Sequence, residues 1–182
     1  RPRIRETARV LWLIYLWLTV MQVLLLRWFG DMGWFDAVNH AFATVATGGF
    51  STRNESLGAY NSAVVDWITI LFMVLAGVNF GLYYHLFRGR MRTGMNDPEL
   101  RLYLGIIVVA SVMVSLSLLS NVIVASTGVK EYPTIGSALQ YGVFQVVSIQ
   151  TTTGFATADS NQWSFVPKTV LLTLMFIGGC AG

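Results

Sequence analysis

The sequence predicts an all-α membrane protein made of two tandem units. Each unit contains a transmembrane helix, a re-entrant half-helix with a following loop, and a second transmembrane helix. Hydrophobic residues make up 54% of the 182 residues and charged residues only 12%, whereas a soluble domain carries about 25% charged residues. Several apolar runs are long enough to cross a bilayer, and two similar polar stretches recur between them. These observations together predict the fold class.

The transmembrane helices are predicted from apolar runs near the roughly 20 residues that cross ~30 Å of hydrocarbon. The four runs cover about 8–28, 63–87, 102–126 and 165–182. They divide the chain into a first unit, residues 1–92, and a second unit, residues 93–182. A glycine-rich end interrupts the last run, and the chain starts without methionine. We therefore expect it to be a fragment of a longer protein.

The distribution of charge predicts the orientation of the spans. Eight of the twelve basic residues lie before the first span or flank the segment between the second and third spans: Arg1, Arg3, Arg5, Arg9, Arg88, Arg90, Arg92 and Arg101. By the positive-inside rule these faces are cytoplasmic. We expect a multi-pass protein of the bacterial inner membrane, with a cytoplasmic N-terminus and two long connections facing the periplasm. Because the basic residues flank spans and form no stripe, no nucleic-acid partner is expected.

Each long outer connection contains an apolar stretch too short to cross the bilayer. These stretches predict pore helices over about 36–46 and 134–150, followed by loops 47–52 and 151–157. The loops align at a shift of 105 positions, which pairs Thr47 with Thr152, Gly49 with Gly154 and Phe50 with Phe155. A repeat in the same orientation predicts units placed around an axis along the membrane normal, enclosing a central path.

The composition of the loops favours a monovalent cation in that path. Non-helical backbone at membrane depth must line protein or water, and the C-terminus of a half-helix directs negative charge toward the membrane centre. Glycine lets backbone carbonyls turn toward a dehydrated ion, and neutral oxygens suit a monovalent ion better than calcium or magnesium. The predicted ligands, mainly through backbone carbonyls, are Thr47, Gly48, Gly49, Thr152, Thr153 and Gly154.

Other side chains near the loops receive open or structural interpretations. Phe50 and Phe155 are predicted to pack behind the loops and hold their diameter. Asp66 has a functional role, reaches water at the outer mouth or caps its helix, and the sequence does not choose among these. His40 is interpreted as a packed histidine in preference to a proton relay. Arg53 either tunes the outer mouth or is a solvated loop charge.

The stretch His40-Ala-Phe-Ala-Thr-Val-Ala-Thr-Gly-Gly-Phe-Ser-Thr-Arg53 resembles the TrkH/KtrB/HKT superfamily of potassium transporters, and its TrkH family in particular. The resemblance implies four span-pore-span units around a potassium-selective pore, of which this chain supplies the second and third. It further implies a gate in the broken last helix, at Gly178, Gly179 and Gly182, a homodimer, and a cytoplasmic nucleotide-binding regulatory subunit. Potassium is then the transported and bound ion, and no cofactor is implied.

Three other functions compete with a channel-like pore. A secondary antiporter or symporter with a site at broken helices would need a buried carboxylate at mid-depth. An intramembrane enzyme would need a Ser-His pair, paired carboxylates or metal ligands on facing spans, and none is present, so the chain is not predicted to be an enzyme. A non-conducting membrane scaffold would leave the repeated loops unexplained. Potassium over sodium selectivity, coupling to other ions and the gating ligand are not determined by these residues.

Overall fold

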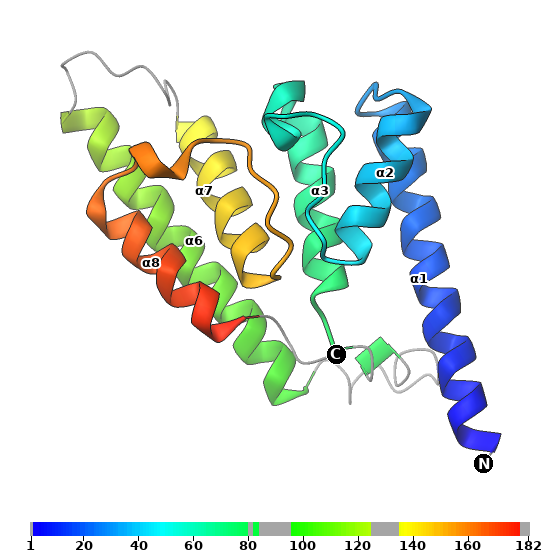
Figure 1. Cartoon of the computed structure of the whole chain (residues 1–182). Coiled ribbons are helices and arrows are strands. Elements are labelled where there is room, and N and C mark those ends of the chain that lie inside the picture. The colour runs from blue at the N-terminus through cyan, green and yellow to red at the C-terminus, as the bar shows by residue number, and fades with distance from the viewer. Residues whose placement is uncertain (1, 80–81, 84–95, 125–134, 179–182) are drawn as a thin grey trace.

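The computed structural model describes residues 2–79, 82–83, 96–124 and 135–178, and no strand occurs in these ranges. The all-α class is therefore confirmed for the part that the structure describes. Figure 1 shows two groups of helices with similar arrangement. The elements are α1 (Pro2–Trp28), α2 (Trp34–Val45), η1 (Ser56–Tyr60), α3 (Ala63–Ala76), α6 (Pro98–Val124), α7 (Ile135–Gln150), η2 (Ser160–Gln162) and α8 (Phe165–Ile177).

Among the described residues, two helices have both the length and the apolar composition to cross a membrane. They are α1 over Ala8–Trp28 and α6 over Pro98–Leu119. The apolar helices α3 and α8 are shorter, at 14 and 13 residues, which corresponds to about 20 Å each at 1.5 Å per residue. Within the described residues, each unit therefore combines one long apolar helix with one apolar helix shorter than the ~30 Å of hydrocarbon in a membrane.

The span predicted over 63–87 is not one continuous helix in the structure. Helix α3 ends at Ala76, and Gly77 caps it. A Cβ placed on Gly77 would lie 2.5 Å from the hydroxyl oxygen of Tyr103, so α6 approaches the backbone closely here. Carbonyl oxygens in the last turn of α3 accept hydrogen bonds from the hydroxyls of Tyr103 (3.2 Å) and Tyr83 (2.6 Å). Side chains thus satisfy carbonyls that helix ends otherwise leave unpaired.

The last two predicted spans differ from the structure mainly at their ends. Helix α6 begins four residues before the predicted 102–126, at Pro98. Helix α8 begins at the predicted residue but ends at Ile177, where Gly178 interrupts the run predicted to reach 182. Of the predicted gate residues, Gly178 is described, whereas Gly179 and Gly182 lie outside the described residues.

The half-helices α2 and α7 lie inside their units. Helix α2 packs against α1 and α3, and α7 packs against α6 and α8. In Figure 1 both half-helices run from the upper side of the molecule to mid-height, with the loops returning upward from their lower ends. Contacts between α3 and α7 join the units, and one apolar core cluster includes residues of both, among them Met73, Phe144 and Phe155. The two loops are therefore held in one packed body.

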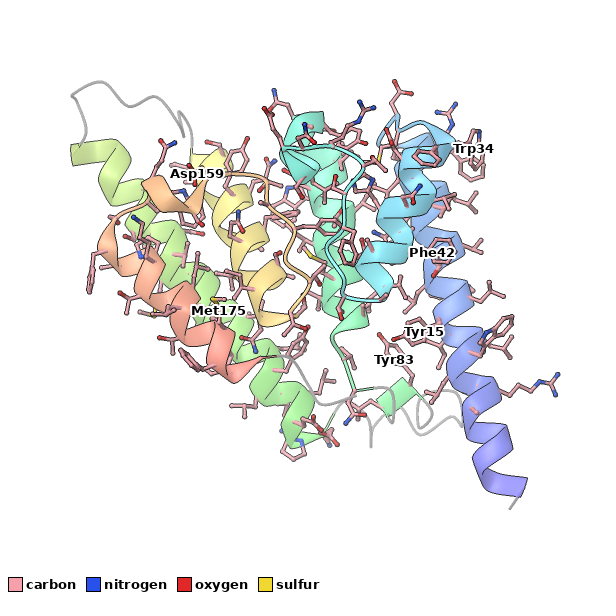
Figure 2. All side chains as sticks on the ribbon, viewed as in Figure 1. Tyr15, Trp34, Phe42, Tyr83, Asp159 and Met175 are labelled. Atoms are coloured by element: carbon pink, nitrogen blue, oxygen red, sulfur yellow. The ribbon has the colours of Figure 1, made fainter. Side chains whose placement is uncertain are left out.

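The outward faces of the long helices are strongly apolar. Large side chains such as Trp17 on α1, Val108 on α6 and Met175 on α8 are more than half exposed, and Figure 2 shows many side chains projecting outward from the ribbon. Such an extended apolar surface is unusual for a soluble protein and fits contact with lipid tails or further helices.

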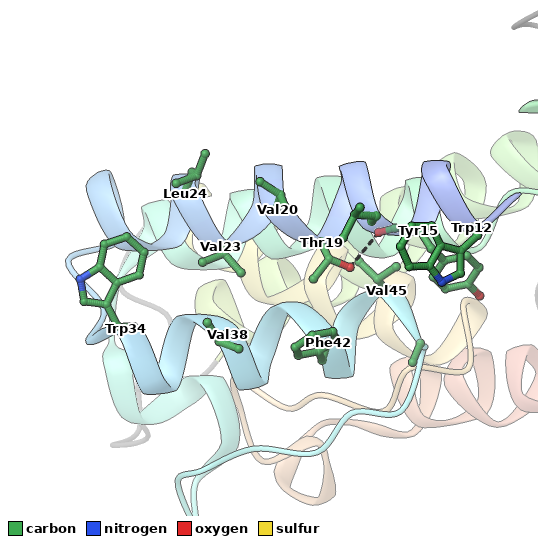
Figure 3. A pocket seen from close by; sticks show the side chains of 12 residues that line it. Trp12, Tyr15, Thr19, Val20, Val23, Leu24, Trp34, Val38, Phe42 and Val45 are labelled. Carbon is green, nitrogen blue, oxygen red and sulfur yellow. Dashed lines mark hydrogen bonds between the residues drawn. The ribbon is translucent and has the colours of Figure 1, made fainter. Parts of the chain in front are cut away.

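A cavity of about 650 Å³ lies between α1 and α2, and Figure 3 shows its lining. Most of that lining is apolar or aromatic, with Tyr15, Val20, Trp34 and Phe42 among the side chains. Such a lining offers few oxygen atoms to bind an ion. The cavity is therefore a packing groove beside the first half-helix, distinct from the loops.

Candidate functional site: two paired re-entrant loops

The first loop begins with a Schellman arrangement at the end of α2. The amide of Gly48 donates to the carbonyl of Ala43 (2.7 Å) and the amide of Thr47 donates to that of Thr44 (3.0 Å). These are the two bonds by which such a motif satisfies the last carbonyls of a helix, with the residue after the cap in the left-handed conformation. Thr47 is that residue, at φ 49°. The chain then turns sharply away from the helix axis.

The second loop repeats this arrangement at the predicted shift of 105 residues. The amide of Thr153 donates to the carbonyl of Ser148 (2.9 Å) and the amide of Thr152 donates to that of Ile149 (3.0 Å). Thr152 has φ 58°. The repeat that the sequence predicts is thus reproduced bond by bond in the backbone.

The backbone at both loop entrances is strained in the same way. Thr47 and Thr152 are β-branched, and a β-branched residue at positive φ is a true outlier, which costs ~1–2 kcal/mol per residue. Two residues later, Gly49 and Gly154 also have positive φ, at 64° and 86°. The alternation of left-handed and ordinary residues turns successive carbonyls in directions that a helix or strand does not allow. Strain of this kind is typical of functional sites.

The two loops meet backbone to backbone. A Cβ placed on Gly49 would lie 2.1 Å from the carbonyl oxygen of Thr153 and 3.1 Å from the carbonyl carbon of Gly154. Gly49 is therefore required both by its φ and by this close approach. Gly154 has open space where its Cβ would be, so only its conformation favours glycine. Of the six predicted ligand residues, the structure thus brings Gly49 of the first loop against Thr153 and Gly154 of the second.

The carbonyls of these loops are available to an ion. Among the described residues, no backbone amide donates a hydrogen bond to the carbonyl oxygens of 47–49 or 152–154. The hydroxyl of Thr153 lies 2.8 Å from that of Thr151, which itself donates to the carbonyl of Val147 (2.8 Å). The buried threonine side chains therefore bond among themselves. What the loops offer to the space between them is mainly backbone oxygen.

Of the two phenylalanines predicted to pack behind the loops, Phe155 packs in the shared core, whereas Phe50 is exposed in the part of the protein that the structure describes. Phe155 is 1% exposed and lies in the shared core, whereas Phe50 is 80% exposed. The hydroxyl of Ser148 donates to the carbonyl of Phe155 (2.6 Å) and holds it against α7. The equivalent position in the first unit is Ala43, which has no hydroxyl to do the same.

His40 holds the return strand of the first loop, which supports its interpretation as a packed histidine. It is fully buried, and its two ring nitrogens contact the carbonyl of Asp36 (2.7 Å) and the hydroxyl of Ser51 (2.9 Å). A carbonyl only accepts, so Nδ1 carries the proton, and in the neutral ring Nε2 accepts from Ser51. The ring also packs near those of Phe155 (5.9 Å between centroids) and Tyr60 (5.6 Å).

The second unit uses a glutamine for the same purpose. Gln145, which is 105 residues after His40, donates from Nε2 to the carbonyl of Ala158 (3.0 Å) beyond the second loop. Neither Gln145 nor Ser51 was predicted as a site residue. The signal was present in the aligned repeat, where both half-helices carry a long polar side chain at the same position on an otherwise apolar face.

Arg53 and Thr52 of the first loop both bind the carboxylate of Asp36, and we call these contacts the Asp36 clamp. The guanidinium of Arg53 donates to one carboxylate oxygen of Asp36 (2.9 Å), and the hydroxyl of Thr52 donates to the other (2.7 Å). The bond from Thr52, with support from the charge of Arg53, lowers the pKa of Asp36 from 3.8 to about 2. Arg53 thus binds the first turn of α2, while its side chain stays 55% exposed to solvent.

This prediction concerns the full-length parent, by which we mean the longer protein of which this chain is expected to be a fragment. We predict that Asp36→Asn lowers its unfolding temperature in detergent by the same amount at about pH 5 and about pH 8. A carboxylate whose pKa falls on folding contributes stability above its ordinary pKa and loses it as pH falls toward the folded value. The difference between variant and wild type should therefore shrink only from about pH 4 down to about 2. A difference that changes between pH 5 and 8 would contradict the Asp36 clamp.

The outer part of the first connection supports the second loop. The amide of Gly58 in η1 donates to the carbonyl of Ala156 (3.2 Å), and the amide of Ala156 donates to the hydroxyl of Ser56 (3.2 Å). A Cβ on Gly58 would lie 3.0 Å from the carbonyl oxygen of Thr157. These contacts span about a hundred residues of sequence, so neither loop is shaped by its own unit alone.

Asp66 also connects the two units. It is only 3% exposed, and its carboxylate accepts a hydrogen bond from Nε2 of Gln140 on α7 (2.6 Å). The sequence leaves open whether Asp66 reaches water at the outer mouth or caps its helix. Its burial and its bond to Gln140 fit neither of these two alternatives. Gln140 precedes the end of α7 by ten residues, about 15 Å, so the pair lies well away from the loop entrance.

We predict that Asp66→Leu destabilises the parent protein by about 1–3 kcal/mol, the cost of leaving a buried amide without its partner. Asp66→Asn keeps an acceptor oxygen and should cost less. Thermal unfolding in detergent measures both changes, and Glu55→Leu, at an exposed acidic residue of the outer connection, serves as the control. Equal loss in Asp66→Asn and Asp66→Leu would show that the negative charge itself is required.

Comparison with known proteins shows which family this chain resembles. A model of the TrkH family, described as a cation transport protein, matches residues 1–182. The TrkH potassium uptake proteins of Salmonella typhimurium and Escherichia coli K12 are 41% and 42% identical, over 100% of this chain and 36% of each relative. The crystal structure of the potassium transporter TrkH from Vibrio parahaemolyticus matches with a TM-score of 0.88 and 37% identity, over 100% of this chain and 37% of that one. The chain thus spans about a third of the proteins it matches.

Proposed function

Because the chain belongs to the TrkH family of cation transport proteins, we propose that it contributes two loops of a channel-like pore for potassium uptake. The observation that best supports this function is the pair of matched loops, which meet at Gly49 and Thr153. The relatives in Salmonella typhimurium and Escherichia coli are named potassium uptake proteins. Backbone carbonyls that no described amide occupies are the groups that replace the hydration shell of potassium in selective pores.

Within this pore the loops act as selectivity-filter strands. Ions bind mainly to backbone carbonyls of the six predicted residues. The C-termini of α2 and α7 each add a partial negative charge of about half an elementary charge. This arrangement suits a monovalent ion, because calcium and magnesium prefer carboxylates. No cofactor takes part in the translocation, and the activity is transport and not an enzymatic reaction.

We further propose the membrane setting that the charge distribution predicts. The parent is a multi-pass protein of the bacterial inner membrane, with the N-terminus of α1 in the cytoplasm and the filter loops open to the periplasm. The exposed apolar faces of α1, α6 and α8 contact lipid and the parts of the parent outside this chain. The units 1–92 and 93–182 are the second and third of four.

The family resemblance extends the proposal to gating and assembly. The glycine-rich segment with Gly178, Gly179 and Gly182 gates the pore beneath the filter. The parent assembles as a homodimer, and a cytoplasmic nucleotide-binding subunit regulates it. The break of α8 at Gly178 is the described feature that fits a gate in this position.

The rival function, a secondary antiporter or symporter, depends on a carboxylate near the ion path. Asp66 is the buried carboxylate that would serve, but its partner Gln140 lies about 15 Å along α7 from the loop entrance. Proton-coupled transport through Asp66 would be lost in Asp66→Asn. A channel-like pore that uses backbone oxygens would keep its flux in that variant.

The function is tested with rubidium and sodium flux into liposomes that contain the full-length parent. We expect rubidium to enter faster than sodium, potassium to compete with rubidium, and Asp66→Asn to retain the flux. Empty liposomes provide the background, and protein insertion is checked for each variant. Absence of selective flux in the inserted wild type would favour a scaffold, and loss of flux in inserted Asp66→Asn would favour the antiporter or symporter.

A further inference from the structure

The end of α8 lies against the base of the second loop, and one side chain joins them. Gly178, which follows the last residue of α8, has φ 66° and ψ −173°, a conformation essentially restricted to glycine. Its carbonyl oxygen accepts a hydrogen bond from Nε2 of Gln150 (2.5 Å). Because a carbonyl can only accept, the orientation of the glutamine amide is fixed by this contact.

Gln150 occupies the position where α7 passes into the loop. It is the last residue of the helix and is 1% exposed, and Thr151 begins the loop directly after it. On the other side of the contact, a Cβ on Gly178 would lie 3.9 Å from the Cγ2 of Thr152. The end of α8 therefore joins the loop base through a hydrogen bond, and the space beside Thr152 would admit a methyl group on Gly178.

The first unit builds its loop without such a bond. The residue equivalent to Gln150 is Val45, which is 2% exposed and packs in an apolar cluster with Ile14, Leu18 and Phe72. Both loops nevertheless have the same helix-end hydrogen bonds. A glutamine is therefore not needed to form the loop, and its contact with Gly178 is an addition specific to the second unit.

The glutamine is also costly at this position. Its Oε1 is buried without a hydrogen-bond partner in the part of the chain that the structure describes. Leaving a buried polar atom unpaired is unfavourable, and an apolar side chain of similar size would avoid the loss. This cost is the reason to look for a role of the amide beyond packing.

We infer that Gln150 is a positioning residue that couples the end of α8 to the second filter loop. The bond to Gly178 holds the loop base at Thr151 and Thr152 in its ion-selective shape, and movement of the end of α8 is transmitted to the loop through the same bond. The inference rests on the proposed pore function. If Gln150 has this role, its side-chain amide matters more for ion selectivity than for the folding of the protein.

Gln150→Met in the full-length parent tests this coupling, because methionine keeps the length of the side chain and removes its donor. In liposomes we expect the ratio of rubidium to sodium flux to fall about fivefold, which converts to ~1 kcal/mol and corresponds to one net hydrogen bond. The matched control is Gln22→Met. Gln22 belongs to the other unit and is fully buried. Its Nε2 donates to Thr44 on α2 (2.9 Å), and its Oε1 has no partner among the described residues.

A second variant, Gly178→Ala, disturbs the same contact from the other side by imposing the wrong φ without a steric clash, and should lower the ratio as well. If Gln150→Met does not insert into the membrane, the flux ratio of Gly178→Ala tests the coupling instead. A ratio unchanged in the inserted variant, or lowered equally by Gln22→Met, would overturn the coupling while leaving the pore intact. Absence of selective flux in wild type would instead overturn the proposed function itself.

Discussion

Gly49→Ser lowers rubidium flux through the full-length parent by about a hundredfold, equivalent to ~2.7 kcal/mol, and removes its preference for rubidium over sodium. The added Cβ would lie 2.1 Å from the carbonyl oxygen of Thr153, a separation that no pair of real atoms of this kind tolerates. One of the two loops must therefore move. Because the clash falls on a carbonyl proposed to bind the ion, the displacement acts directly on the site.

The same substitution at Gly154 provides a comparison within one experiment. Gly154 has φ 86° but open space around its Cβ position, so Gly154→Ser adds backbone strain of ~1–2 kcal/mol without a clash. We expect a smaller loss of flux, about tenfold. The ratio of the two effects separates steric displacement from backbone strain.

Gly33→Ser is the matched control for both filter variants. Gly33 precedes α2, has φ −60°, and has open space at its Cβ position. Serine is favoured before the first residue of a helix, so this variant should conduct like wild type. Equal loss of flux in all three variants would indicate a general failure to fold, and wild-type flux in inserted Gly49→Ser would contradict the filter assignment.

The local parts of this structure were predictable from sequence because their causes are local. The half-helix predicted over 36–46 is observed as Trp34–Val45, and that predicted over 134–150 as Ile135–Gln150. Apolar periodicity defines the helices, and Thr-x-Gly-Phe in both copies marks where each one must stop. The repeat also predicted which residues occupy equivalent places, as the matching bonds to Ala43 and Ser148 demonstrate.

The remaining features depend on contacts between residues distant in sequence. Gly77 marks a possible end of α3 in the apolar run after Ala63, but the close approach of Tyr103 on α6 at this point is a property of the packed structure. The repeat predicts the same environment for Phe50 and Phe155. Residues of both units bury Phe155, and this chain spans only about a third of its relatives, so the burial of Phe155 depends on a neighbouring unit and not on its own sequence. The pairs Asp66–Gln140 and Gln150–Gly178 likewise join residues whose proximity no local pattern predicts.

His40→Leu reduces the selectivity of the parent about tenfold, whereas His40→Gln retains most of it. Leucine fills the space but leaves the hydroxyl of Ser51 and the carbonyl of Asp36 without the partners that the ring supplies, at a cost of about 1–3 kcal/mol for buried polar groups. Glutamine has the reach and the donor for such a contact, because Gln145 forms the equivalent bond beyond the second loop.

The flux assay in liposomes separates these variants, with Asn39→Leu as a control on the same half-helix. The amide of Asn39 bonds only within α2, to the carbonyl of Phe35 (2.7 Å) among the described residues, so its loss should leave selectivity unchanged. Equal loss in His40→Gln and His40→Leu would show that the imidazole ring is needed for its packing against Phe155 and Tyr60. Retention of activity in His40→Gln alone would establish that one hydrogen-bonding role is filled by two side chains, one in each unit.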